Sequence, residues 1–185
     1  MPPAARSWLD GIALADKVLA LAAFSGAARA VGKAPIAVPE RGAWGTDEVV
    51  RAALLVRAYP GIRPAELWAH GDNRERQAVL KALPLLPEPA AFVELAIEAC
   101  RTNVLTVFEA IACENPYPAA HFPELHFNQL ALKAAFNGIV LARIVGLAAR
   151  RNTELARMAA DYAAERRAAG RPVPDDLGLL MQGQP

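Results

Sequence analysis

Apolar residues recur at three- and four-residue intervals along almost the whole chain, and this limits the possible folds more than any other feature. The strict alternation that marks a strand is nearly absent. Alanine, the strongest helix former, is abundant, whereas aromatic residues make up only 6% of the chain. We therefore predict an all-α protein of about eight helices.

Proline and glycine divide this pattern into segments. A loop is expected over Ile36–Gly45, and extended chain over Asn115–Pro118. Thr46 is expected to cap the second helix, with the negative charges of Asp47 and Glu48 in its first turn, and Asp72 with Glu75 to form a capping box. Asn152 is expected to cap the last predicted helix, and Gly138 to follow the end of the helix before it. The expected helices cover about 5–31, 46–58, 64–69, 73–83, a segment from about 89, 103–113, 123–137 and 153–170.

Helices and proline turns alternate from Asp72 to Asn137, which favours antiparallel helix pairs as in HEAT-like solenoids. No fixed repeat period is visible in the sequence. The 185 residues suit one domain. We predict a single helical domain over 1–174, followed by a surface or disordered tail over 175–185.

The net charge of +1 gives no electrostatic footprint for nucleic acid. The longest charge-free run near the N-terminus, Val18–Ala28, is too short to span a membrane. We find no signal-peptide pattern, and we expect Cys100 and Cys113 to be reduced thiols. A cytoplasmic protein without a membrane span is therefore expected.

The segment Pro123–Asn137 carries the most informative polar residues. One stripe of this expected helix, either a solvated face or a wall of donors lining a cleft, consists of His126, Gln129, Lys133 and Asn137. Glu124 and Asn128 lie on the opposite, more apolar side. An unpaired buried Asn128 would cost about 1–3 kcal/mol. It therefore either bonds within a structural network, for example to carbonyls of the Asn115–Pro118 turn, or faces a ligand.

Three further residues invite a functional interpretation. Asn103 joins an apolar face if its helix continues the preceding one. Glu109 would form an acid/base pair with Glu124 if the two converged, and is otherwise a solvated carboxylate. Arg166 lies near the apolar side of the last helix, where it either snorkels to solvent or binds a ligand.

The spacing of His121, Glu124 and His126 argues against a metal site. Residues two apart on a helix point about 200° apart, unlike the i, i+4 pair of a helical zinc site. The sequence also lacks a glycine-rich phosphate loop, a nucleophile elbow and a Ser/His/Asp arrangement. We therefore expect neither a metal nor a cofactor, and the residues alone name no reaction.

The sequence resembles a known family over about Lys81–Pro174, with a looser match at Gly32-Lys33-Ala34. The matching segments occur in the family's order: Ala82–Pro87, Arg101–Asn103, Val107–Ala112, Asn115-Pro-Tyr-Pro118, Phe127-Asn-Gln129, Leu132-Lys-Ala134, Arg143–Leu147 and Asp161–Arg171. They resemble the EboA family. Phe127 stands where the family usually has Trp, Ala164 and Arg167 replace a His and a Trp, and the tail after Pro174 is shorter.

The resemblance implies a bacterial protein of an ebo-type gene cluster. Such clusters also encode a membrane prenyltransferase-like protein, a TatD-like hydrolase and a sugar-phosphate-cyclase-like protein, and they are linked to moving secondary-metabolite precursors toward the periplasm. It therefore implies an accessory protein that binds a metabolite intermediate or a cluster partner, and we favour a non-enzymatic role. An enzyme acting on a small, partly apolar intermediate and an adaptor for the membrane component are the alternatives.

The candidate ligand-binding residues combine the polar positions above with the family-like segments. They are Asn103, Glu109, Asn115, Tyr117, Glu124, Asn128, Gln129, Lys133 and Arg166.

Overall fold

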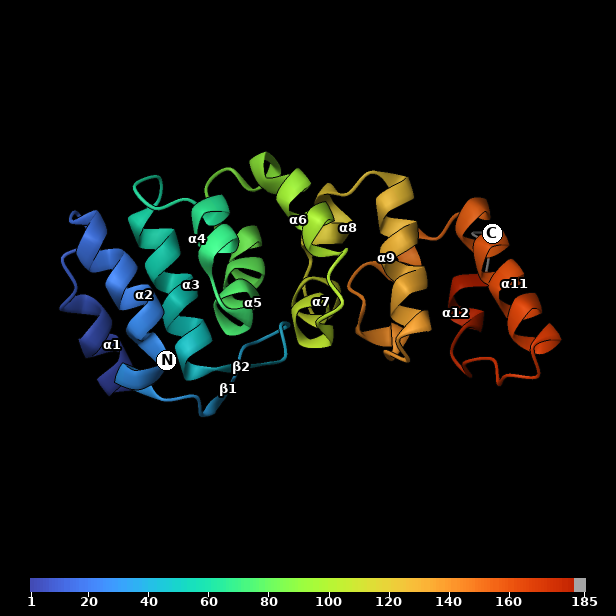
Figure 1. The fold of residues 1–185 in the computed structure, drawn as a ribbon, viewed down its shortest axis with the longest axis horizontal. Helices are drawn as coiled ribbons and strands as arrows, with labels where there is room; N and C mark the ends of the chain where they lie inside the picture. The colour runs from blue at the N-terminus through green and yellow to red at the C-terminus, as the bar shows by residue number, and fades with distance from the viewer. Residues whose placement is uncertain (182–185) are drawn as a thin grey trace. The chain divides into compact units, whose positions relative to one another are not determined.

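The structure, a computed structural model, describes residues 1–181. These residues form twelve α-helices, three short 3-10 helices and one two-stranded sheet (Figure 1). The mostly helical fold predicted from the sequence is confirmed, although the helices are shorter and more numerous than expected. The chain divides into two compact units, which meet in sequence between Ile111 and Ala112.

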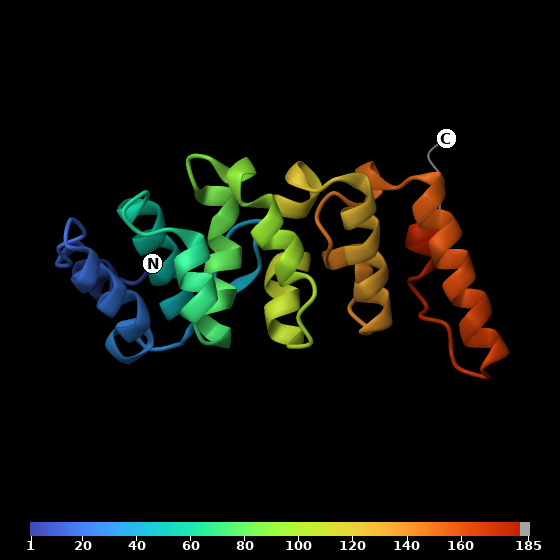
Figure 2. The ribbon, with the colours of Figure 1, turned by 45° about the horizontal axis from the view of Figure 1, so that its top comes forward.

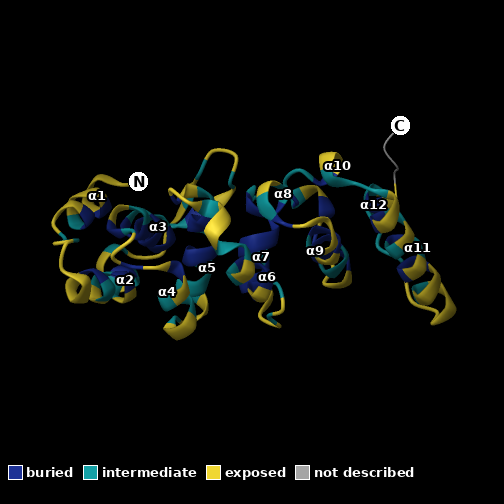
Figure 3. Ribbon diagram, turned by 90° about the horizontal axis from the view of Figure 1, so that it is seen from above, coloured by how far each residue is buried: buried dark blue, intermediate teal, exposed yellow. Residues whose placement is uncertain are grey.

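The first unit contains seven α-helices, of which the last, α7, extends one residue past the boundary. Its elements are α1 (Pro3–Asp10), α2 (Lys17–Val31), β1 (Pro35–Ala37), β2 (Ala43–Gly45), α3 (Thr46–Ala58), α4 (Pro64–His70), α5 (Asn73–Ala82), η1 (Leu83–Leu85), η2 (Pro89–Phe92), α6 (Val93–Ala99) and α7 (Leu105–Ala112). Helix α3 packs against both α2 and α5 (Figures 1 and 2). Its residues Val50, Leu54 and Leu55 are fully buried and recur at helical spacing. Figure 3 accordingly shows much of α3 in the colour of buried residues.

Three local predictions for the first unit are wrong. The expected long first helix is two helices, because Asp16 accepts hydrogen bonds from the N–H groups of Val18 and Leu19 and so caps a new start at Lys17. The expected loop contains the antiparallel pair β1–β2, with Ile36 opposite Trp44. Thr46 is the first helical residue rather than the cap, and its hydroxyl donates to the carbonyl of Ala34 at 2.8 Å.

The second unit is built around α9. Its elements are α8 (Tyr117–His121), α9 (Glu124–Phe136), η3 (Leu141–Arg143), α10 (Leu147–Arg150), α11 (Thr153–Ala168) and α12 (Gly178–Met181). Helix α9 packs against η3, α10 and α11, and α12 packs against α11 (Figure 1). Asn152 caps α11, as predicted, since its side chain accepts a hydrogen bond from the N–H of Leu155 at 2.8 Å.

The segment Asn115–Pro118 is not extended, as the sequence led us to expect. The side chain of Asn115 accepts a hydrogen bond from the N–H of Tyr117 at 3.0 Å, and helix α8 begins there with Pro118 in its first turn. The expected tail from residue 175 contains α12, whose Leu180 is buried together with the preceding Leu177. The last four residues of that tail, 182–185, lie outside the described residues.

No helix within residues 1–181 is long and apolar enough to cross a membrane. Within residues 1–181 neither Cys100 nor Cys113 forms a disulfide; Cys113 is buried and Cys100 half-buried. The HEAT-like arrangement and the single domain over 1–174 stay predictions.

Candidate functional site

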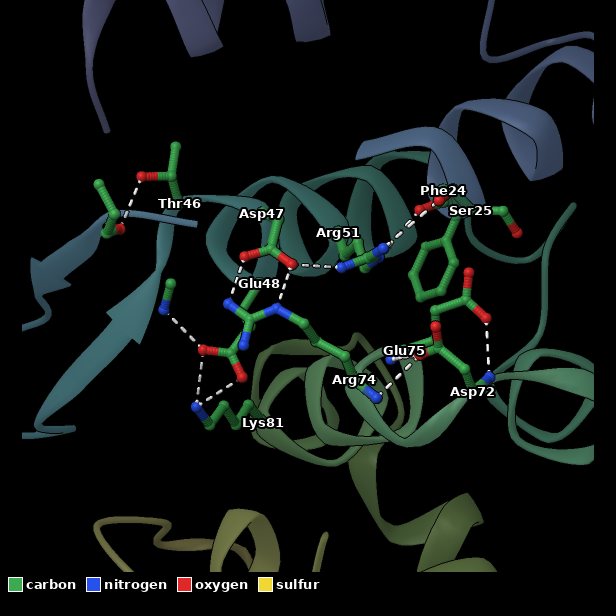
Figure 4. Close-up of polar contacts among 12 residues, drawn as sticks. Phe24, Ser25, Thr46, Asp47, Glu48, Arg51, Asp72, Arg74, Glu75 and Lys81 are labelled. Carbon is green, nitrogen blue, oxygen red and sulfur yellow. Dashed lines mark hydrogen bonds and ion pairs between the residues drawn. The ribbon is translucent and has the colours of Figure 1, made fainter. Parts of the chain in front are cut away.

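Five charged side chains gather beside the first turn of α3 in the first unit (Figure 4). We call them the charged cluster, and they are Asp47, Glu48, Arg51, Arg74 and Lys81. From the sequence, Asp47 and Glu48 are only carboxylates at a helix start, and no sequence signal singles out the three cations.

Asp47 is the centre of the cluster, and its side chain is fully buried. It accepts hydrogen bonds from the Nη1 of Arg51 at 2.6 Å and from the Nε and Nη2 of Arg74 at 2.5 and 2.6 Å. Arg51 is only 2% exposed and also donates from Nε to the carbonyl of Phe24 at 2.9 Å. This chain of contacts connects α2, α3 and α5.

Glu48 is the second carboxylate of the cluster, and it pairs with Lys81. It accepts from the backbone N–H of Gly45 at 2.6 Å, and both of its oxygens lie 2.9 Å from the Nζ of Lys81 on α5. The same ammonium group lies 5.4 Å from the centre of the Trp44 ring, close enough for a cation–π contact.

The electrostatics of the cluster favour the charged forms. Burial by itself raises the pKa of the Asp47 carboxyl, but the hydrogen bonds and charges of Arg74 and Arg51 outweigh it and hold that pKa below its ordinary value of 3.8. The hydrogen bond to Asp47 in turn raises the pKa of Arg74. Every carboxylate in the cluster is already paired with a cation, so we assign the charged cluster a structural role.

Two of the predicted site residues belong to the first unit. Asn103 is exposed in the turn before α7, so the condition that its helix continues the preceding one is not met. Glu109 lies half-buried on α7.

Asn128, on α9, is the predicted residue whose surroundings the structure defines best. It is 1% exposed, and its side-chain amide exchanges two hydrogen bonds with that of Asn152, at 3.1 and 3.0 Å. Asn152 also caps α11, so this amide pair joins α9 to the start of α11. Asn128 thus pairs with the residue that caps α11. The sequence had suggested the carbonyls of the Asn115–Pro118 turn as one example of a partner.

This geometry predicts that Asn128→Ala lowers the free energy of unfolding by about 1–3 kcal/mol, because the Asn152 amide is left with unmet hydrogen bonds. Urea unfolding monitored by circular dichroism measures the loss. Gln129→Ala is the matched control, since Gln129 is the adjacent, exposed amide and should change stability by no more than about 0.5 kcal/mol. An Asn128→Ala protein of wild-type stability that has lost its ligand would instead show that Asn128 faces the ligand.

The remaining predicted residues of the α8–α9 region differ in exposure. Asn115 and Tyr117 are buried, Glu124 and Gln129 are exposed, and Lys133 is half-buried. Among residues 1–181, no three His, Cys, Asp or Glu side chains are placed to hold one metal ion.

Arg166 is the predicted residue that the structure places at an open groove of the second unit. We call this groove the Arg166 groove, and its volume is about 570 Å³. It is lined by Ala135, Gly138, Ile139, Val140, Arg166 and residues 172–176.

The groove forms where α9 and α11 end. Gly138 adopts a φ of +68°, which a residue with a side chain rarely does, and this lets the N–H of Ile139 donate back to the carbonyl of Ala134 at 3.0 Å. After α11, Pro172 and Pro174 cannot continue a helix, so the chain turns back along the groove. Asp176 fixes this returning segment by accepting from the N–H of Leu141 at 2.6 Å.

Arg166 is held at the groove by two contacts. Its Nε donates to the carbonyl of Pro172 at 2.9 Å, and its guanidinium carbon lies 5.9 Å from the centre of the Tyr162 ring. Among the described residues, its remaining guanidinium N–H groups have neither a hydrogen-bond nor an ion-pair partner. They are available to an acceptor that enters the groove.

Residues 13–182 match the family model described as metabolite traffic protein EboA. The chain belongs to the EboA family. No curated protein and no solved structure matches it.

The EboA match covers Phe127, Ala164 and Arg167, the three positions that the resemblance led us to expect as departures from the family's usual residues. Phe127 is fully buried in α9, where its ring lies 4.7 Å from the guanidinium carbon of Arg150. Ala164 and Arg167 are exposed on α11 and do not line the Arg166 groove. None of these three residues lines the Arg166 groove.

Proposed function

We propose that this chain binds a small, partly apolar metabolite in the Arg166 groove. The observation that carries the proposal is the guanidinium of Arg166, held beside apolar walls with N–H groups available for a ligand. A guanidinium is the protein group best suited to pair with a carboxylate or phosphate, because it offers two parallel donors.

The dimensions of the groove support this proposal. Its volume of about 570 Å³ lies within the range of about 300–1,000 Å³ that is typical of small-molecule sites. Ile139, Val140 and Val173 supply apolar surface along it, so a carbon skeleton placed there would be removed from water.

The family description, metabolite traffic protein, supports a role in transport more than in chemistry. We propose that the chain acts in the cytoplasm as an accessory protein of an ebo-type cluster. There it holds a secondary-metabolite precursor for transfer toward the periplasm, and the membrane prenyltransferase-like protein of the cluster is a candidate recipient.

Native mass spectrometry tests the proposal on protein purified from a host whose pathway is blocked at a later step. We expect wild-type protein to carry a bound small molecule and Arg166→Gln to carry it at about one tenth of that occupancy or less, since a charge-assisted hydrogen bond contributes about 1.5–3 kcal/mol. Arg167→Gln is the matched control, because Arg167 is the adjacent arginine but lies outside the groove. Equal occupancy in the two variants would contradict the proposal.

A further inference from the structure

The Arg166 groove contains a carboxylate that the proposed function leaves unused. Asp175 lines the groove and is exposed, and among the described residues it has no ion-pair or hydrogen-bond partner. In particular, Asp175 and Arg166 do not pair with each other, although both line the same groove. A cation and an anion thus face one groove, each available to a ligand.

The fold holds the charged group of Arg166 and the backbone next to Asp175. The Pro172 carbonyl and the Tyr162 ring fix Arg166. Asp175 lies between Pro174 and Asp176, and the latter is tied to the N–H of Leu141.

The charge balance of the groove argues against a simple anion as the ligand. Arg166 contributes one positive charge, whereas Asp175 and Asp176 contribute two negative charges. A purely anionic ligand would gain from Arg166 but would be repelled by the carboxylates, which lowers the net electrostatic gain. A ligand with an additional positive group would be attracted at both places.

We propose that the ligand is a zwitterion with an apolar body, of the amino-acid type. Its acidic group pairs with Arg166, its ammonium group pairs with Asp175, and its body lies against the apolar wall of Ile139, Val140 and Val173. This inference rests on the proposed function, because it names the ligand class of the same groove.

Three commercial probes separate the contributions of the two charges. L-phenylalanine has both charged groups, N-acetyl-L-phenylalanine has only the carboxylate, and 2-phenylethylamine has only the ammonium group. The full chain is stripped of ligand by dialysis, and its affinity for each probe is measured by NMR titration. We expect L-phenylalanine to bind about tenfold more tightly than either singly charged probe, since one charge-assisted hydrogen bond is lost in each case.

The variants give a second readout. Asp175→Asn should reduce the affinity for L-phenylalanine about tenfold and leave the affinity for N-acetyl-L-phenylalanine equal or higher. Arg166→Gln should weaken both carboxylate probes and leave 2-phenylethylamine unchanged. Glu165→Gln removes a nearby exposed charge outside the groove and should change none of the three affinities.

N-acetyl-L-phenylalanine binding as tightly as L-phenylalanine would overturn the inference and leave the proposed function standing. If none of the three probes binds, the inference of a zwitterionic ligand is also overturned. The proposed function is decided separately, by how much metabolite Arg166→Gln retains in native mass spectrometry. Because Asp175 is exposed, unchanged thermal unfolding of Asp175→Asn should confirm that its effect is on binding.

Discussion

Replacing Asp47 with alanine is expected to lower the free energy of unfolding by about 3–5 kcal/mol, because it leaves the buried Arg51 and the half-buried Arg74 without their counter-charge. Arg51, at 2% exposed, would keep its contact with the Phe24 carbonyl but lose its only ion pair among the described residues. Arg74 would lose two hydrogen bonds at once. Urea unfolding followed by circular dichroism measures the change.

The exposed ion pair between Asp10 and Arg57 provides the matched control. Its groups lie 2.7 Å apart but are about half exposed, so Asp10→Ala should cost no more than about 1 kcal/mol. The lowered pKa of Asp47 makes this stabilisation depend on pH. The contribution of the ionised carboxylate is complete above pH 3.8, the ordinary pKa of the group, and is lost as the pH falls through the lower pKa that Asp47 has in the folded protein. The gap between wild type and Asp47→Ala should therefore shrink in strong acid. Equal losses in Asp47→Ala and Asp10→Ala at neutral pH would show that burial adds nothing to the pair.

The second large effect is expected at Leu180, which is fully buried where α12 packs against α11. Leu180→Ala should lower the free energy of unfolding of the second unit by about 2–5 kcal/mol, since it leaves a cavity in a packed contact. Amide hydrogen exchange should show faster exchange in residues 172–181, which include one wall of the Arg166 groove.

Leu125→Ala is the same substitution at an exposed position on α9, where the leucine is 55% exposed. It should change stability by no more than about 0.5 kcal/mol. If Leu180→Ala is equally neutral, α12 does not hold the wall of the groove in place.

Local sequence signals were sufficient to predict several helix ends. The capping box of Asp72 and Glu75 is present, with the Asp72 side chain accepting from the Glu75 N–H at 2.8 Å. Asn152 and Gly138 also take their predicted roles. These predictions succeeded because each depends on residues within one turn of the chain, although the equally local prediction for Thr46 was wrong by one residue.

Predictions failed where one local signal competed with another. Proline restricts the residue before it but is also favoured in the first turn of a helix, and in Asn115–Pro118 the second effect prevails because Asn115 caps the turn. In the same way, Asp16 looks like a charge within one long helix, yet its side chain starts a new one.

The partners of polar residues could not be predicted because they come from distant parts of the chain. Helical spacing indicated that Asn128 needs a partner, but Asn152 is 24 residues away. Asp47 and Glu154 both look like acidic residues at a helix start, whereas the first is buried among cations and the second is exposed. Arg166 was recognised by its position near an apolar face, while the opposite wall of its groove lies in a segment expected to be peripheral.

Whether Arg166 holds a metabolite in its groove is decided by native mass spectrometry of Arg166→Gln and Arg167→Gln prepared side by side. We expect Arg167→Gln to carry the same bound molecule as wild type, at similar occupancy, and Arg166→Gln to carry about one tenth of it or less. A metabolite retained equally by both variants would show that the binding site lies elsewhere.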